Sequence, residues 1–280
     1  MDGHFRAFTF VDRITSVQPR VRIEGGYAVP AALDSFPQAL AVEAVGQLAA
    51  WAAMAAVDFK VRPVAGIAGK VDLISTVQPG QTLDLVAHIE TAEEDAVAYG
   101  GHASVAGVPV VSLEHCVGPM MPVEEFDDSV AIRDQFVRLC GPGATPGGFG
   151  GMPQLALNYT GGETGERLLA TLDVPATGDF FADHFPRKPV FPGTLFMHLI
   201  LQMAELLAAQ IPAPAAGGVW KARSVTDAKL RAFIPPGDRL DFEAKVDEVN
   251  EDSILIAVVG RKNKRVVGGN NVRFTAGKPS

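Results

Sequence analysis

The chain has 280 residues, a formal net charge of −8 and a hydrophobic content of 48%. This length fits one large domain or two small ones, and the apolar content is sufficient for a packed core. A net acidic chain is a poor candidate for non-specific nucleic-acid binding, because that binding depends on neutralising phosphates.

The first predicted elements are a strand and a long apolar helix. No basic stretch followed by a long apolar run precedes the strand "FTFVDRITSV" (8–17), so no secretory signal is expected. Within this strand, Asp12 and Arg13 are expected to form a structural ion pair. Residues 39–57 are apolar and rich in alanine, with a single charge at Glu43. Because a membrane helix favours stronger apolar side chains and no carboxylate, we predict a buried helix in a cytoplasmic protein.

This helix has a second copy later in the chain. Residues 36–53 match residues 191–208 at an offset of 155, and six positions are identical without a gap. The identical pairs are Phe36/Phe191, Pro37/Pro192, Leu40/Leu195, Gln47/Gln202, Ala49/Ala204 and Ala53/Ala208. After each copy come a strand, a Pro-Gly turn (79–80 and 236–237), a second strand and a further hairpin, with turns near residues 107 and 262–264. The sequence therefore predicts two related halves.

The two helices determine the predicted architecture. A helix that is apolar on nearly every side must be buried on nearly every side, and a curved antiparallel sheet wrapped round it achieves this. Joining two such sheets edge to edge also protects their exposed edges. We therefore predict an α+β fold with an N-terminal unit (1–122), a linker (123–150) and a C-terminal unit (151–280). The linker is expected to contain a helix at 124–140 and a flexible glycine-rich end at 141–151.

The two cysteines, Cys116 and Cys140, do not have the spacing of a disulfide framework or of a zinc site. We expect both to be free thiols, buried or partly buried, in a reducing compartment. No metal or other cofactor is predicted.

The stretch "HFPRKPVFPGTL" (184–195) resembles the active-site segment of the 3-hydroxyacyl-acyl-carrier-protein dehydratases of bacterial fatty-acid synthesis. That family has His-Phe-Pro, a short step, Pro-Val-x-Pro-Gly, and then a helix with an acid and, four residues later, a glutamine. The strand at 8–17 and the Pro-Gly-Asp at 236–238 are also similar to the family's pattern. The resemblance implies the hotdog fold, here as a double hotdog in which two sheets each wrap a long central helix and join as a pseudo-dimer.

The departures from the family's pattern divide one site between the two halves. In the family the helix acid follows the histidine by fourteen residues, but the residue fourteen places after His184 is His198. The first half has an acid at the equivalent helix position, Glu43, with Gln47 four residues later. Since the family builds each site across a two-fold interface, the resemblance implies one complete site from His184, Gly193 and Glu43.

The remaining positions would form a second site that lacks the residues needed for the chemistry. The first-half counterparts of His184 and Gly193 are Val29 and Gln38. His198 is the third residue of this second site, and it is expected to be a packed, hydrogen-bonded residue.

The residues of the complete site suit the removal of water from a 3-hydroxyacyl thioester. A neutral imidazole at His184 can take the C2 proton near pH 7. An apolar tunnel favours the protonated form of a carboxyl group, so Glu43 can donate to the leaving hydroxyl, with Gln47 holding it in place. The N–H of Gly193, in the first turn of its helix, can polarise the thioester carbonyl. Three further motif residues are expected to support the site or contact the substrate: Phe185, Phe191 and Pro192.

The predicted substrate carrier is an anionic phosphopantetheine on an acyl carrier protein or on coenzyme A. Six basic residues flank the motif or follow the second helix, and they are expected to form a basic entrance for this carrier. They are Arg187, Lys188, Lys221, Arg223, Lys229 and Arg231. An equally open interpretation is that they are solvated cations at strand edges.

Two other functions stay open on the sequence alone. The same fold serves as an acyl-thioesterase that uses a carboxylate and water, although the His-Phe-Pro motif argues against this. A non-catalytic acyl-thioester-binding subunit is the third hypothesis, because half of the family's catalytic residues are absent. The leading hypothesis is a lyase of fatty-acid, polyketide or lipid synthesis that works as a monomeric pseudo-dimer or as a homodimer.

Overall fold

An antiparallel sheet and three α-helices make up the computed structural model, which describes residues 4–64, 66–213 and 218–277. The elements of the first half are β1 (Arg13–Gln18), β2 (Arg22–Ala28), α1 (Gln38–Ala56), β3 (Val61–Pro63), β4 (Ile67–Leu73), β5 (Thr82–Ala92), β6 (Ala96–Val105) and β7 (Val108–Pro122). The connection contains the 3₁₀ turn η1 (Val123–Glu125) and α2 (Ser129–Cys140). The elements of the second half are β8 (Asn158–Glu163), β9 (Arg167–Asp173), η2 (Asp179–Ala182), α3 (Gly193–Ala208), β10 (Val219–Leu230), β11 (Arg239–Val249), β12 (Ser253–Lys262) and β13 (Arg265–Gly277).

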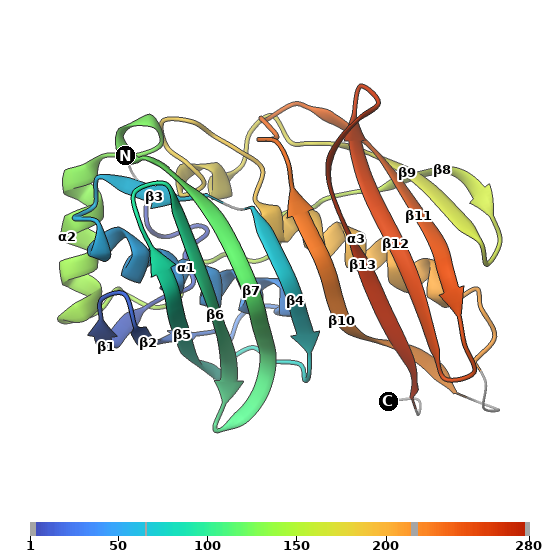
Figure 1. Ribbon diagram of the computed structural model, residues 1–280, viewed down its shortest axis with the longest axis horizontal. Coiled ribbons are helices and arrows are strands. Elements are labelled where there is room, and N and C mark those ends of the chain that lie inside the picture. Colours follow the sequence, from blue (N-terminus) through green and yellow to red (C-terminus); the bar gives the residue numbers. More distant parts are fainter. Residues whose placement is uncertain (1–3, 65, 214–217, 278–280) are drawn as a thin grey trace.

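The sheet runs across the whole molecule, and α1 and α3 lie behind it in Figure 1, each beneath the strands of its own half. The strand order is β1-β2-β5-β6-β7-β4-β10-β13-β12-β11-β9-β8, and β3 pairs with β7 beside this path. The two halves meet where β4 pairs with β10, with Val71 opposite Val225. The predicted double hotdog with a continuous sheet is therefore confirmed.

Helix α1 is buried because the sheet curves closely round it. Leu40, Ala44 and Leu48 are fully buried. Gly101 of β6 permits the close approach, since a Cβ at that position would lie 2.7 Å from Cγ1 of Val45. By length and composition α1 could also cross a membrane, but 67% of its most apolar window is buried inside the protein. The helix predicted from residues 39–57 is thus the core helix of the first half.

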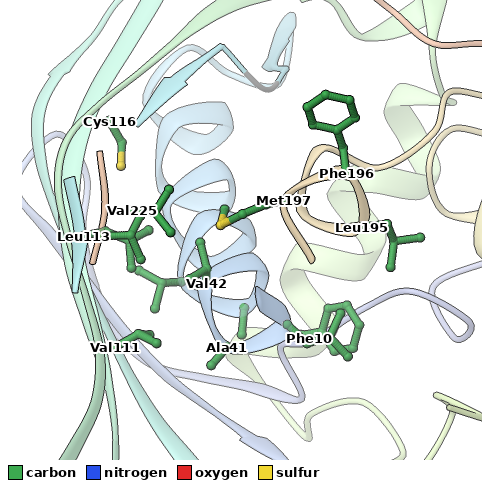
Figure 2. Packing of buried hydrophobic residues seen from close by; sticks show 14 of the residues in the cluster. Phe10, Ala41, Val42, Val111, Leu113, Cys116, Leu195, Phe196, Met197 and Val225 are labelled. Carbon is green, nitrogen blue, oxygen red and sulfur yellow. The ribbon is translucent and has the colours of Figure 1, made fainter. Parts of the chain in front are cut away.

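The two central helices also pack against each other at the seam between the halves. Figure 2 shows Val42 of α1 and Met197 of α3 close together, with Leu113 and Val225 of the sheet beside them. All four side chains are buried and belong to one hydrophobic core that extends through both halves. The relative position of the halves is therefore fixed by apolar packing as well as by strand pairing.

The strands that flank the two Pro-Gly turns are not neighbours, as a simple hairpin would require. β4 lies between β7 and β10, whereas β5 lies between β2 and β6, and β10 and β11 are separated in the same way. Residues 74–81 are too many for a tight hairpin loop and carry the chain across the sheet. The two later hairpins are confirmed: two-residue loops with positive φ, Ala106-Gly107 (49° and 79°) and Asn263-Lys264 (49° and 68°), join β6 to β7 and β12 to β13.

The connecting helix α2 is shorter than predicted. It begins at Ser129 because Asp128 caps it, and the carboxylate of Asp128 accepts two N–H groups of the first turn at 3.0 and 3.1 Å. Cys140, the last residue of α2, is exposed rather than buried, whereas Cys116 is buried. Both cysteines are free thiols, as predicted.

The ion pair predicted near the N-terminus is wrong. Asp12 does not pair with Arg13; its Oδ2 accepts the N–H of Ala28, at the end of β2, at 2.7 Å. Neighbouring residues of an extended chain point to opposite sides, so the adjacent strand supplies a better partner than the next residue does.

The glycine-rich end of the linker is anchored by an aromatic side chain. Phe149 is 3% exposed, and its ring packs edge-on against Phe8, Phe10 and Phe36 with centroids 5.0 to 6.4 Å apart. The segment predicted as a flexible linker is therefore held against the first half at this point.

We expect Phe149→Ala to lower the free energy of unfolding by about 3–5 kcal/mol, because it leaves a cavity in this aromatic cluster. Urea denaturation followed by circular dichroism measures the change. Phe233→Ala is the matched control, since Phe233 is 38% exposed and its loss should cost less than about 1 kcal/mol. Equal losses in the two variants would contradict an anchoring role for Phe149.

Candidate active site

His184 lies in the loop between η2 and α3, and the backbone fixes one side of its ring. Nδ1 lies 3.2 Å from the carbonyl oxygen of Val190, whose N–H donates to the His184 carbonyl at 2.9 Å. Because a carbonyl oxygen only accepts, Nδ1 carries the hydrogen and Nε2 keeps a free lone pair. The buried ring of Phe185 stacks on the imidazole with centroids 4.4 Å apart, across a cis peptide bond.

Glu43 is held at both of its carboxylate oxygens. Gln47, one turn later on α1, donates from Nε2 to Oε1 at 2.9 Å, and the hydroxyl of Thr194 on α3 donates to Oε2 at 2.6 Å. Gln47 is itself fixed, because it donates to the carbonyl of Phe8 and accepts the N–H of Phe10. The carboxylate of the first half is thus oriented in part by a residue of the second half.

Helix α3 begins at Gly193, directly after Pro192, just as α1 begins at Gln38 after Pro37. The N–H groups of a first helical turn have no partner inside the helix and lie at the positive end of the helix dipole. Gly193 lines a cavity, so its N–H is in place to meet a ligand. Thr194 was not predicted from the sequence. The one sequence feature that could have indicated it is its position directly after Gly193.

One cavity of about 250 Å³ brings the predicted residues of both halves together. Glu43 and Gln47 of α1 line it, together with His184, Phe185 and Gly193 of the second half. The wall of this cavity does not include the residues of the expected second, incomplete site, which are Val29, Gln38 and His198.

Phe191 and Pro192 lie behind the cavity rather than in its wall. Both are buried, and the N–H of Phe191 donates to the carbonyl of Ile234 at 2.7 Å. These contacts hold the loop that leads into α3, and the predicted role of the two residues in the site stays a prediction.

The cavity continues along one face of α1 away from Glu43. Gly46, Ala50 and Met54 share that face, and Leu139 of α2 lies in the same cavity wall. The small side chains of Gly46 and Ala50 leave space between the helix and the strands. This arm of the cavity is therefore mostly apolar, as a site for an acyl chain requires.

The surroundings favour a neutral imidazole. Burial lowers the pKa of His184, the charge of Glu43 raises it and that of Arg62 lowers it, so that the pKa lies below its ordinary value of 6.5. Nε2 is therefore unprotonated at pH 7 and able to accept a proton. Burial also raises the pKa of the Cys116 thiol in the cavity wall to about 12, so this thiol stays protonated and is a poor nucleophile.

The N-terminal segment anchors the residue before His184. Asp183 accepts the N–H groups of residues 5, 6 and 8, the last at 2.7 Å. His4 bridges Asp183 and Asp127 with nitrogen–oxygen distances of 3.4 and 3.1 Å. Burial lowers the pKa of His4, but its bonds to the two carboxylates outweigh burial and raise the pKa to about 9. A positively charged His4 thus ties the N-terminal segment to the loop that carries His184, a contact that the sequence did not reveal.

The basic residues of the motif have partners within the chain. Arg187 forms an ion pair with Glu124 and another, at 3.1 Å, with Asp128, and Lys188 lies 3.4 Å from Glu125. These acidic residues belong to the connecting segment, so the two cations hold that segment against the loop that carries His184. Their predicted role as carrier contacts stays a prediction.

The other predicted carrier contacts lie on or after β10. Arg223 donates from Nε to the hydroxyl of Thr275 at 3.1 Å, and Lys229 lies 3.5 Å from Asp227. Lys229 also lines the cavity, and Arg231 is exposed. Among the residues that the structure describes, two Lys or Arg side chains line the cavity: Lys229 of β10 and Arg62 of β3, which pairs with Asp127 at 3.2 Å.

The groups in the cavity can move protons and stabilise negative charge. His184 Nε2 can accept a proton, Glu43 can hold or release one, and the N–H of Gly193 can donate a hydrogen bond. Among the residues that the structure describes, no cluster of three or more His, Cys, Asp or Glu side chains has the geometry of a metal site.

Comparison with known families relates the second half to dehydratases. Residues 161–270 match the ApeI-like family, described as ApeI dehydratase. The 3-hydroxyacyl-acyl-carrier-protein dehydratase FabZ of Paracidovorax citrulli is 34% identical over 89 residues, and that of an Anaeromyxobacter species is 37% identical over 87 residues. These matches cover 31% and 30% of this chain and only 61% and 55% of the relatives. The predicted resemblance to the hotdog dehydratases is confirmed.

Solved structures with a similar fold extend over nearly the whole chain. A protein assigned as an oleoyl thioesterase from Lactobacillus plantarum has a TM-score of 0.58 at 9% identity and covers 92% of this chain and 97% of its own. The 12:0-ACP thioesterase from Umbellularia californica has a TM-score of 0.55 at 8% identity, covering 91% and 94%. At such low identity these structures show the fold alone.

Glu43→Gln should lower the pKa of the His184 imidazole further, because it removes the negative charge that raises this pKa. An NMR titration of the imidazole ring protons measures the change. Glu205→Gln, on α3 and outside the cavity wall, is the matched control and should leave the His184 pKa unchanged. An unaltered pKa in Glu43→Gln would contradict an arrangement in which the two side chains face one cavity.

Proposed function

Because its second half is related to the hotdog dehydratases, we propose that this chain dehydrates 3-hydroxyacyl thioesters to trans-2-enoyl thioesters at one composite active site. The observation that carries the proposal is the shared cavity, lined by Glu43 from the first half and by His184 and Gly193 from the second. An acid, a base and an N–H donor in one cavity are the groups that this elimination requires.

The proposed reaction transfers two protons. His184 Nε2 takes the proton from C2, while the N–H of Gly193 stabilises the negative charge that develops on the thioester oxygen. Glu43 enters the reaction protonated, after its carboxylate takes up one proton from solvent, and the C3–O bond breaks as it gives this proton to the hydroxyl, which leaves as water. Proton transfer from the imidazolium to the Glu43 carboxylate then restores both groups for the next turnover.

One site per chain follows from the way in which the residues are divided. The first-half counterpart of His184 is Val29, which has no proton to exchange, and the second-half counterpart of Glu43 is His198. Neither residue lines the cavity. In this proposal the chain acts as a pseudo-dimer whose second potential site has lost the chemistry.

The substrate is proposed to arrive on the phosphopantetheine of an acyl carrier protein or of coenzyme A. Lys229 in the cavity wall and the exposed Arg231 support a basic entrance for the phosphate. The acyl chain then lies along α1, past Gly46 and Ala50. Fatty-acid or other acyl-lipid synthesis in the cytoplasm is the proposed setting.

His184→Ala and Glu43→Gln should each lower kcat/KM for a 3-hydroxyacyl thioester by about 10²- to 10⁴-fold, because each removes a proton-transfer group. The ultraviolet absorbance of the enoyl thioester product measures the rate. Val29→Ala and His198→Gln, at the counterpart positions, are the matched controls and should change the rate little.

Three outcomes of this experiment would contradict the proposal. Release of free thiol without an enoyl product would identify a thioesterase instead. Binding of acyl thioesters by the wild type without turnover would identify a non-catalytic subunit. A loss in His198→Gln as large as that in His184→Ala would contradict the composite site.

Thr194→Val should lower kcat about tenfold with little change in KM, because it removes one hydrogen-bond donor to Glu43 and keeps the shape of the side chain. Thr194→Ser retains the hydroxyl and should retain most of the activity. Steady-state kinetics of both variants measure the effect. Equal losses in the two variants would indicate a packing role for Thr194 instead of a role in positioning Glu43.

A further inference from the structure

Asn270 is a buried amide in the cavity wall whose oxygen has no protein partner. The residue belongs to β13, is 6% exposed and lines the cavity. Among the residues that the structure describes, its Oδ1 has no hydrogen-bond partner. An unpartnered buried polar atom costs free energy, so in a cavity wall it indicates a ligand that supplies the missing donor.

The pseudo-two-fold relation gives Asn270 an apolar counterpart. Asn270 lies opposite Val258 of β12, and Leu113 lies opposite Gly101 of β6 at the equivalent register. Leu113 is 3% exposed and lines the same cavity. The fold therefore accepts leucine at this register position, and the amide of Asn270 is not a requirement of the sheet.

Two parts of the cavity wall differ in polarity. The part along α1 beyond Glu43 is apolar at Ala50 and Met54. The part contributed by the second half contains Asn270 and Lys229 together with Phe196 of α3. An unpartnered carbonyl oxygen and a cation thus occur in the same part of the wall, which suits a polar, anionic ligand.

We propose that Asn270 holds the pantetheine arm of the substrate by accepting a hydrogen bond from one of its amide N–H groups. The inference rests on the proposed function only in taking the substrate to be a pantetheine thioester. Pantetheine carries two amides, whereas an acyl chain offers no N–H donor. The pantetheine arm therefore lies beside Asn270, with the phosphate that is attached to its far end in phosphopantetheine toward Lys229, and the acyl chain lies along α1.

Asn270→Val tests this assignment, because it removes the acceptor and introduces an apolar side chain, as the counterpart Leu113 has. The two substrates are 3-hydroxyhexanoyl-pantetheine and the S-propyl thioester of the same acid, which has no amide. We expect kcat/KM to fall about fivefold to tenfold for the pantetheine thioester and to stay unchanged for the propyl thioester. Asn271→Val is the matched control, since Asn271 follows on β13 and does not line the cavity.

A binding measurement separates this inference from the proposed function. S-Hexyl-pantetheine is a thioether that can be neither dehydrated nor hydrolysed, and calorimetry should show weaker binding to Asn270→Val than to the wild type and Asn271→Val. If this difference is found in a wild type that does not dehydrate, the proposed function alone fails. Equal losses on both thioesters, or equal binding of S-hexyl-pantetheine by all three proteins, would overturn the inference and leave water as the partner of Asn270.

Discussion

The antiparallel pairing of β4 with β10 is the constraint on which the site depends. It relates the two halves by a pseudo-two-fold, with Val71 opposite Val225, and so brings the first turn of α3 beside α1. Only in that position can Thr194 reach Glu43, which lies 151 residues earlier in the chain. Main-chain hydrogen bonds between β4 and β10 thus set the relative positions of side chains that are far apart in the sequence. The packing of α1 on α3 reinforces the same arrangement.

The seam also allows the two copies of one motif to differ. Each half needs its helix and its sheet to fold, so both retain a buried apolar helix that begins after a Phe-Pro pair. The reactive groups are under no such structural requirement, and each has been kept in one half alone. His184 and Gly193 come with one helix and Glu43 with the other, and all three line a single cavity. The elements that the fold requires therefore occur twice in this chain, whereas His184, Gly193 and Glu43 each occur in one half alone.

The sequence revealed those features that depend on local composition or on the repeat. The burial of α1 followed from its apolar residues, and the helix position of Glu43 followed from the offset that also aligns Phe36 with Phe191. Strand order could not be derived, because a Pro-Gly turn reverses the chain without choosing which strand will pair. Thr194 and Asp183 were missed for a related reason: their partners lie more than 150 residues away, and no periodicity encodes such a contact. The cap at Asp128 was also missed, although the Asp-Ser pair that opens α2 is a local signal for it.

A true two-fold dimer must repeat every side chain, so the mouths of its two sites are identical. Within one chain this restriction disappears, and an apolar Leu113 and a polar Asn270 can occupy equivalent register positions. The cavity wall thereby differs along its length: Ala50, Met54 and Leu139 are apolar, whereas Asn270 and Lys229 carry an amide and an ammonium group. A linear ligand with one apolar end and one polar end matches this wall in a single orientation. The asymmetry that leaves one of the two potential sites incomplete thus also gives the wall of the remaining cavity two chemically different parts.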